Sequence, residues 1–222
     1  MQTFATPAPI AAVVTVPAAR IEVAAADRAD TTVEIRPANP GNSRDVRAAE
    51  EITAVCADGA LRITAPEAKH QAFGSSGSVE ITVGLPAGSG LEVTAAAGEL
   101  RAAGPLGDVV VESARGPVRL DEAASARIVL QDGAITIGRL AGGGELVTQR
   151  GDLTVSEAVG GKLVLNTQKG DITVTAAAGA SASLDAGTGY GRVTNTLKND
   201  GSTPALAIAA TTSYGDIAAR GL

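Results

Sequence analysis

Gly151-Asp152-Leu153-Thr154-Val155 and Gly170-Asp171-Ile172-Thr173-Val174 are near copies of one another, and Gly215-Asp216-Ile217 opens a third copy. They belong to a longer series of repeat units that starts at residue 98, and each unit begins with a glycine. Successive leading glycines are 18, 17, 18, 19, 21 and 24 residues apart. A period of this size indicates a repeat architecture, with one structural unit per segment. The leading glycines, which we expect to form structural turns, are Gly98, Gly116, Gly133, Gly151, Gly170, Gly191 and Gly215.

Each unit contains two short runs in which apolar and polar residues alternate. In the fourth unit, Leu153 and Val155 are expected to point inward and Thr154 outward, and Leu163 and Leu165 are expected to point inward from the second run. Alternation with a period of two predicts strands. A unit of about 18 residues is too short for a βαβ unit, which needs about 30. We therefore predict an all-β fold in which each unit is one coil of a parallel β-helix, or β-solenoid. An antiparallel β-sandwich is the alternative.

The first 97 residues lack this period, and prolines separate their strand-like runs. Asp58-Gly59 between two such runs predicts a two-residue hairpin turn. Ser43 is expected to cap a short helix over Arg44–Glu51. We expect residues 1–97 to form a strand-rich section that caps the solenoid and residues 98–222 to form its coils, within one continuous domain.

The composition excludes several classes of protein. The formal net charge is −6 and the isoelectric point is about 4.9, which argues against nucleic-acid binding. One histidine and one cysteine exclude a Cys/His zinc site and a disulfide framework. No apolar run is long enough to cross a membrane, and the first basic residue, Arg20, comes too late for a secretory leader. We expect a cytoplasmic protein without membrane insertion, or one of the cell envelope if a leader has been removed.

Two acidic residues are weak candidates for a metal or glycan site. If the coils stack in register, Asp152 and Asp171 lie about 4.8 Å apart, and carboxylates that close can share a cation. Arg150 and Lys169 each precede one of them by two residues. This spacing favours a structural role instead, in which each aspartate lies in a turn near a counter-charge.

Tyr190 and Tyr214 both precede a leading glycine, so we expect their rings to stack. A buried pair would close the core, and an exposed pair would be a recognition patch. His70 lies in a polar stretch and Cys56 in a strand-like run without a neighbouring histidine. We therefore predict no catalytic residue, no cofactor and no enzymatic activity.

Several segments together resemble a known family, and they span nearly the whole chain. They are Thr15-Val16-Pro17, Ile21-Glu22-Val23, Asp58-Gly59-Ala60-Leu61, Leu85-Pro86-Ala87-Gly88-Ser89, the Gly-Asp-Ile/Leu-Thr-Val units and the ending Tyr214-Gly215-Asp216-Ile217. In their order they are similar to the bacterial putative-adhesin family of β-strand repeat proteins, a family of unknown function common in actinobacteria. The resemblance implies a right-handed β-helix-like fold and no catalytic residues.

Three functions follow from these observations. The first is a non-enzymatic scaffold or protein-interaction module with an unknown protein partner, indicated by the repeat and the scarcity of catalytic side chains. The second is self-assembly, in which solenoids associate as homo-oligomers through their ends. The third is a glycan-binding or carbohydrate-active β-helix protein, which depends on the two aspartates.

Overall fold

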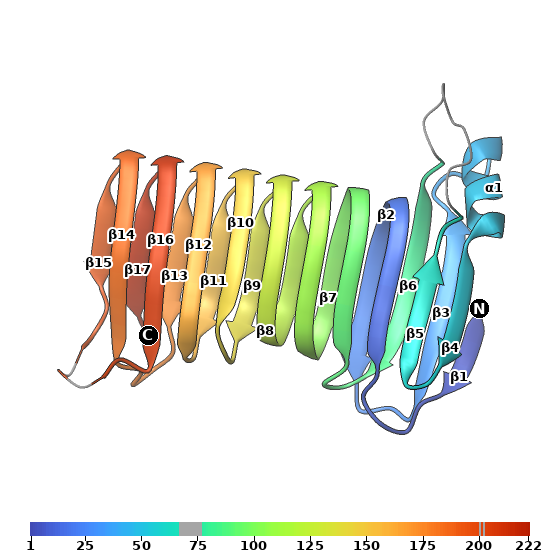
Figure 1. Cartoon of the computed structure of the whole chain (residues 1–222), viewed down its shortest axis with the longest axis horizontal. Helices are drawn as coiled ribbons and strands as arrows, with labels where there is room; N and C mark the ends of the chain where they lie inside the picture. The colour runs from blue at the N-terminus through green and yellow to red at the C-terminus, as the bar shows by residue number, and fades with distance from the viewer. Residues whose placement is uncertain (67–76, 200, 202) are drawn as a thin grey trace.

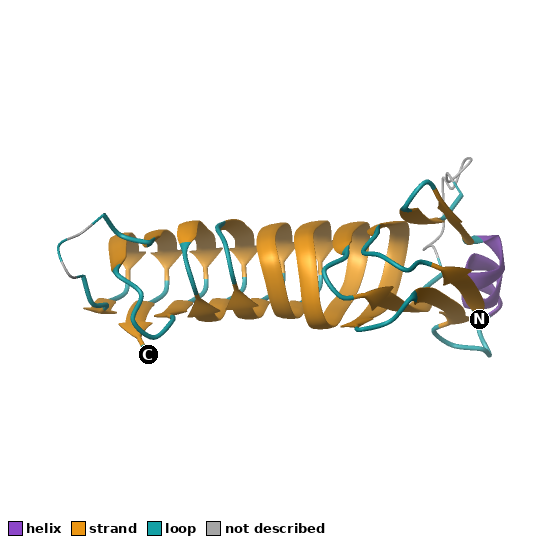
Figure 2. Ribbon diagram, turned by 90° about the horizontal axis from the view of Figure 1, so that it is seen from below, coloured by secondary structure: helices purple, strands orange, loops and turns teal. Residues whose placement is uncertain are grey.

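The computed structural model describes residues 1–66, 77–199, 201 and 203–222. The chain winds into a stack of flattened coils, with the helix α1 (Ser43–Glu51) at the N-terminal end of the stack (Figure 1). Each coil contributes strands to two layers that face one another (Figure 2). The strands are β1 (Gln2–Ala5), β2 (Ala11–Ala26), β3 (Asp30–Pro37), β4 (Thr53–Ala57), β5 (Ala60–Thr64), β6 (Val79–Pro86), β7 (Gly90–Arg115), β8 (Val118–Asp132), β9 (Ile135–Leu140), β10 (Gly144–Arg150), β11 (Leu153–Ala158), β12 (Gly161–Lys169), β13 (Ile172–Ala176), β14 (Ala182–Tyr190), β15 (Val193–Thr196), β16 (Leu206–Tyr214) and β17 (Ile217–Gly221).

Neighbouring coils pair in parallel, with like positions in register. β10 pairs with β12 in one layer, and β11 pairs with β13 in the other. One interior column runs through Leu153, Ile172, Ile217 and Val193. Parallel pairing of successive coils confirms the predicted β-solenoid and excludes the antiparallel sandwich, whose neighbouring strands run in opposite directions.

The N-terminal end differs from the rest of the stack. Among the strands that the structure describes, antiparallel pairing occurs only between β1 and β3, β3 and β6, and β4 and β5. The parallel stack nevertheless begins early, because β2 pairs in parallel with β7 over most of its length. The division of the chain at residue 97 stays a prediction, and the parallel register crosses it.

The predicted hairpin and helix both form. Asp58 and Gly59 join β4 to β5 with φ angles of 51° and 72°, the conformation that a two-residue turn between twisted strands requires. The predicted cap was wrong: Asn42, not Ser43, accepts a hydrogen bond from the backbone N–H of Arg44. Both residue types cap helices well, and the extended backbone of Asn42 aims its side-chain oxygen at the first turn. No helix in the described ranges is long and apolar enough to span a membrane.

The last two coils are stacked in the reverse of their chain order. β16 pairs with both β12 and β14, so the coil of β16 and β17 lies between the coil of β12 and β13 and the coil of β14 and β15. Ile208 and Ile217 of the inserted coil are buried. The outer coil places Asn195 in register with the buried Ala219. The more apolar coil thus takes the position that is covered on both sides, and the more polar coil lies at the end.

The core is made almost entirely of aliphatic side chains. Val155 and Leu165 are buried, as predicted. Cys56 is half-buried and packs against the core at the N-terminal end. Residues on β2, β7 and β8 alternate between buried and exposed along each strand, so the interior is narrow and suits Val, Ile, Leu and Ala better than aromatic rings.

Candidate functional site

The glycines that open the repeat units form one column along a corner of the solenoid. Gly133 and Gly151 have φ angles of 156° and 143°. A Cβ atom at Gly151 would lie 2.1 Å from the carbonyl oxygen of Gly133, so the close approach of the backbones requires glycine. The column continues through Gly170 to Gly215 and ends at Gly191. The residues before and after these glycines therefore form two columns along the same corner.

In the coils that begin at Gly151, Gly170 and Gly215, the residues that follow the glycines form a ladder of aspartates. The Oδ1 atom of Asp152 accepts a hydrogen bond from the backbone N–H of Asp171 at 2.9 Å, and Oδ1 of Asp171 accepts one from Asp216 at 2.8 Å. Asp216 accepts one from Arg192 at 2.8 Å. These bonds tie each coil to the next and give the carboxylates a structural role. Cation or glycan binding by Asp152 and Asp171 stays a prediction.

The column that precedes the glycines changes from charged to aromatic side chains near the C-terminal end. Arg150, Lys169, Tyr214 and Tyr190 lie in successive coils. The two tyrosine rings stack with centroids 5.0 Å apart and an angle of 4° between their planes. Tyr190 is 72% exposed and Tyr214 is 57% exposed. The pair therefore stacks as predicted but does not close the core, and it forms an aromatic patch on the surface.

The outermost coil leaves two strand edges unpaired. In the described part of the chain, β14 pairs with β16 alone and β15 pairs with β17 alone. Val193 is 44% exposed, whereas Ile217, the preceding residue of the same column, is 1% exposed. Leu184 and Ala186 are half-buried at the end of the core. We call this surface the open end: the outer edges of β14 and β15 with Leu184, Ala186, Val193 and the outer face of Tyr190.

Two cations flank the tyrosine pair. Lys169 is in register with Tyr214, and Arg192 follows Tyr190 across the glycine corner. Neither side chain forms an ion pair with any residue that the structure describes, whereas Arg150 pairs with Asp132 at 2.9 Å. The corner of the open end thus combines aromatic rings with two basic side chains, and the carboxylates of Asp171 and Asp216 lie at the same corner.

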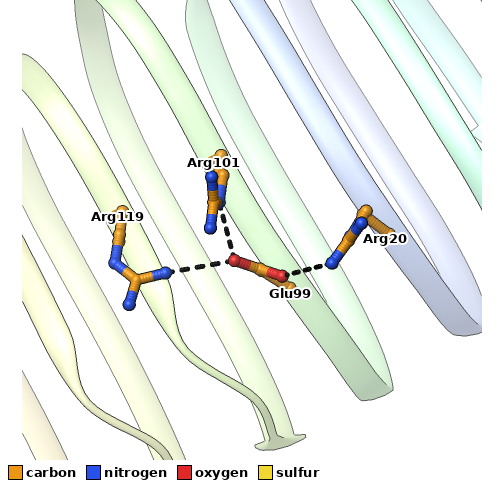
Figure 3. A network of polar contacts seen from close by, with 4 residues as sticks. All are labelled: Arg20, Glu99, Arg101 and Arg119. Carbon is orange, nitrogen blue, oxygen red and sulfur yellow. Dashed lines mark hydrogen bonds and ion pairs between the residues drawn. The ribbon is translucent and has the colours of Figure 1, made fainter.

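A second polar cluster lies on the opposite half of the stack (Figure 3). The Glu99 carboxylate receives hydrogen bonds from Arg101 at 2.7 Å, Arg20 at 3.1 Å and Arg119 at 3.1 Å. The bond from Arg101 and, to a lesser degree, that from Arg20 lower the pKa of Glu99 below the usual glutamate value, and burial acts against this shift. These contacts join β2, β7 and β8. These contacts therefore stabilise the stack.

A shallow hollow of about 470 Å³ lies beside this cluster. Its lining includes Glu22, Arg101, Arg119 and Asp121, so charges of both signs face it. In the described ranges no group of three or more His, Cys, Asp or Glu side chains could hold a metal ion. His70 lies outside the described residues.

The model of the family described as Toastrack DUF4097 matches residues 12–220. A putative adhesin from Bacteroides fragilis is 14% identical, with a TM-score of 0.52 over 98% of this chain and 95% of that chain. A putative adhesin from Parabacteroides distasonis is 13% identical, with a TM-score of 0.43 over 98% of this chain and 95% of that chain. A putative cell adhesion protein from Clostridium sporogenes is 11% identical, with a TM-score of 0.42 over 100% of this chain and 98% of that chain. No curated protein matches the chain.

Proposed function

The chain belongs to the Toastrack DUF4097 family, and from this premise we propose that it is a non-enzymatic interaction module that binds a protein partner at the open end. The observation that carries the proposal is the exposed stack of Tyr190 and Tyr214 beside unpaired strand edges. Tyrosine and arginine are enriched where protein interfaces concentrate their binding energy. Arg192 follows Tyr190 by two residues, so both residue types occur at this corner.

The chemistry of the open end supports binding rather than catalysis. Tyr190, Tyr214, Lys169 and Arg192 can stack, donate hydrogen bonds and attract anionic groups. Catalysis of acyl or glycosyl transfer needs a nucleophile paired with a base, or two carboxylates across a cleft. The carboxylate next to the corner, Asp216, accepts a backbone hydrogen bond. The description of the Bacteroides fragilis structure as a putative adhesin agrees with a binding role.

The remaining features of the partner follow from charge. A chain with a net charge of −6 repels the phosphate backbone of nucleic acids and anionic lipid surfaces. We therefore propose a protein partner and no membrane insertion, with the cytoplasm as the place of action. The cell envelope is the alternative.

Affinity capture with matched variants tests this function. The immobilised wild-type chain is compared with the double variant Tyr190→Ser and Tyr214→Ser on an extract of the native source, with the two Tyr→Phe substitutions as the control. We expect the wild type and the phenylalanine variant to capture the same protein and the serine variant to lose it. Equal capture by all three, or turnover of glycan or ester substrates that Asp152→Asn abolishes, would contradict the proposal.

Self-association is a second candidate, favoured by the unpaired outer edges of β14 and β15. Exposed strand edges pair readily with other edges. Light scattering across a range of protein concentrations measures the mass directly. A rise toward twice the chain mass that Val193→Lys prevents would support this candidate, and a constant monomer mass would exclude it.

A further inference from the structure

The backbone N–H of Ala182, the first residue of β14, donates a hydrogen bond to the carbonyl oxygen of Lys198 at 3.0 Å. Beyond this residue, the outer edge of β14 faces a position in the ladder that no described strand fills. Every other strand of this layer from β8 to β16 has a parallel neighbour on both sides. We infer that an extended peptide segment of the partner occupies this position and adds a parallel strand to β14. This inference rests on the proposed function and names the form in which the partner binds. Strand addition supplies affinity through main-chain hydrogen bonds and specificity through alternate side chains.

β16 shows what a strand beside β14 requires. On the inner side of β14, Ile208 lies opposite Leu184, and Ala210 lies opposite Ala186. Since the coils repeat by translation, a strand on the outer side meets the same two side chains from the other direction. An incoming peptide therefore needs small or medium apolar residues at alternate positions. These residues would cover the apolar columns that now end half-exposed at Leu184 and Ala186.

The tyrosine stack sets the direction of the added strand. The inner face of Tyr190 lies against Tyr214, and no strand of the described chain lies beyond its outer face. A parallel strand whose aromatic residue occupies the register of Tyr214 would continue the stack by one ring. The sequence pattern of the ligand then matches that of Ile208, Ala210 and Tyr214, with two apolar residues two apart and an aromatic residue four positions further on.

The same geometry argues against a second copy of the chain as the occupant. Two copies related by a twofold axis would pair their β14 strands antiparallel, so Tyr190 of each copy would lie near the far end of the other strand and the ring stack would stop. The N-terminal end offers only the short edges of β1 and β4, which contain four and five residues. A parallel strand from a different protein can both pair with the outer edge of β14 and place an aromatic ring on Tyr190.

The sequence of β16 provides the probe for a binding experiment. A fluorescein-labelled peptide with the sequence Leu206–Tyr214 and an added lysine tag is titrated with the intact chain, and anisotropy is recorded. We expect saturable binding that becomes about tenfold weaker in Tyr190→Ser, the loss expected for one aromatic stacking contact. Tyr190→Phe should bind as the wild type does. A peptide that carries serine in place of the final tyrosine should show the same tenfold loss. An absence of binding, or binding that ignores both serine changes, overturns the inference.

Backbone methylation separates strand addition from other modes of binding. Alternate N–H groups of a strand point to opposite sides, so a peptide at an edge uses only one of its two sets. We expect N-methylation of one alternate set to abolish binding and methylation of the other set to leave it intact. Loss with both sets would mean that the peptide replaces β16, and loss with neither would mean that no ladder forms; each result overturns the inference. If the peptide fails while capture of the partner still depends on the tyrosines, strand addition is wrong and the interaction function stands.

Discussion

The two ends of the solenoid are terminated in different ways. At the N-terminal end, β1, β3 and β4 turn antiparallel to their neighbours and α1 lies beside them (Figure 1). Val33 of β3 is buried there. At the C-terminal end, the last coil keeps the parallel geometry of the stack, and Val193 is half-exposed in a column that is otherwise buried. One end is thus covered by separate elements, whereas the other is only made more polar, which leaves its ladder available to a further strand.

The largest difference in stability is expected between aspartate substitutions in the interior of the stack and the same substitution at the open end. Val155→Asp places an unpaired charge in the closed core and should lower the free energy of unfolding by about 4 kcal/mol or more. Leu165→Asp should act alike. Val193→Asp leaves its carboxylate in contact with water and should cost under about 1 kcal/mol. Chemical denaturation followed by circular dichroism measures all three, and similar midpoints would show that the interior face has been wrongly assigned.

The glycine column gives the next largest difference. Gly151→Ala brings a Cβ atom against the carbonyl oxygen of Gly133 and forces a left-handed backbone on alanine, so we expect a loss of roughly 3 kcal/mol. Gly187 of the outermost coil has no atom within 4 Å of the same Cβ position, and Gly187→Ala should be nearly neutral. Thermal melts of both variants test this contrast. Equal melting temperatures would contradict the close approach of the backbones.

Much of this architecture could be predicted from the sequence because it depends on local patterns. The alternation of Leu153, Thr154 and Val155 predicted their sides correctly, and the repeated glycines predicted the parallel register. The order of the last two coils could not be predicted, since Tyr190-Gly191 and Tyr214-Gly215 share the same pattern and fit the same register. Which of the two coils lies outermost depends on how much apolar surface each arrangement buries, and the alternation of residues does not measure this.

Only part of the candidate site could be predicted, because the order of the last two coils also decides which side chains are exposed. The stacking of the tyrosines follows from their shared position before a glycine, but their exposure and the free face of Tyr190 depend on which coil lies outermost. Asn195 is polar at a position that is apolar in neighbouring coils. This is a signal in the sequence that could have identified the end of the stack. The sequence singled out Asp152 and Asp171 because the repeat brings them into register, but their acceptance of backbone N–H groups requires coordinates.

A smaller effect is expected along the aspartate ladder. Asp152→Ala removes the acceptor for the N–H of Asp171 and should cost about 1 kcal/mol. Asp152→Asn keeps an acceptor oxygen and should lose less. Asp185→Ala, on the exposed face of the outermost coil, serves as the control and should be close to neutral. Urea unfolding resolves these differences, and a loss in Asp185→Ala as large as in Asp152→Ala would argue against the ladder as the cause.

The smallest effect on stability is expected at Glu99, in the half of the stack nearer the N-terminal end. Ion pairs, not aspartates, join the coils there. The pKa of Glu99 is lower in the folded chain than its usual value of 4.5, mainly through the hydrogen bond from Arg101. A lowered pKa contributes stability that is present above the unfolded value and is lost as the pH falls through the folded value.

The melting temperature of Glu99→Gln should therefore lie below that of the wild type at pH 7, and this gap should close as the pH falls below about 4.5. Because the three arginines remain partly exposed to water, solvent screening keeps the gap to a few degrees. Glu92→Gln, on the same strand and without an ion pair among the described residues, should show no such pH dependence. A gap of equal size at pH 7 and pH 3 would mean that Glu99 contributes through packing and that its charge does not hold β2, β7 and β8 together.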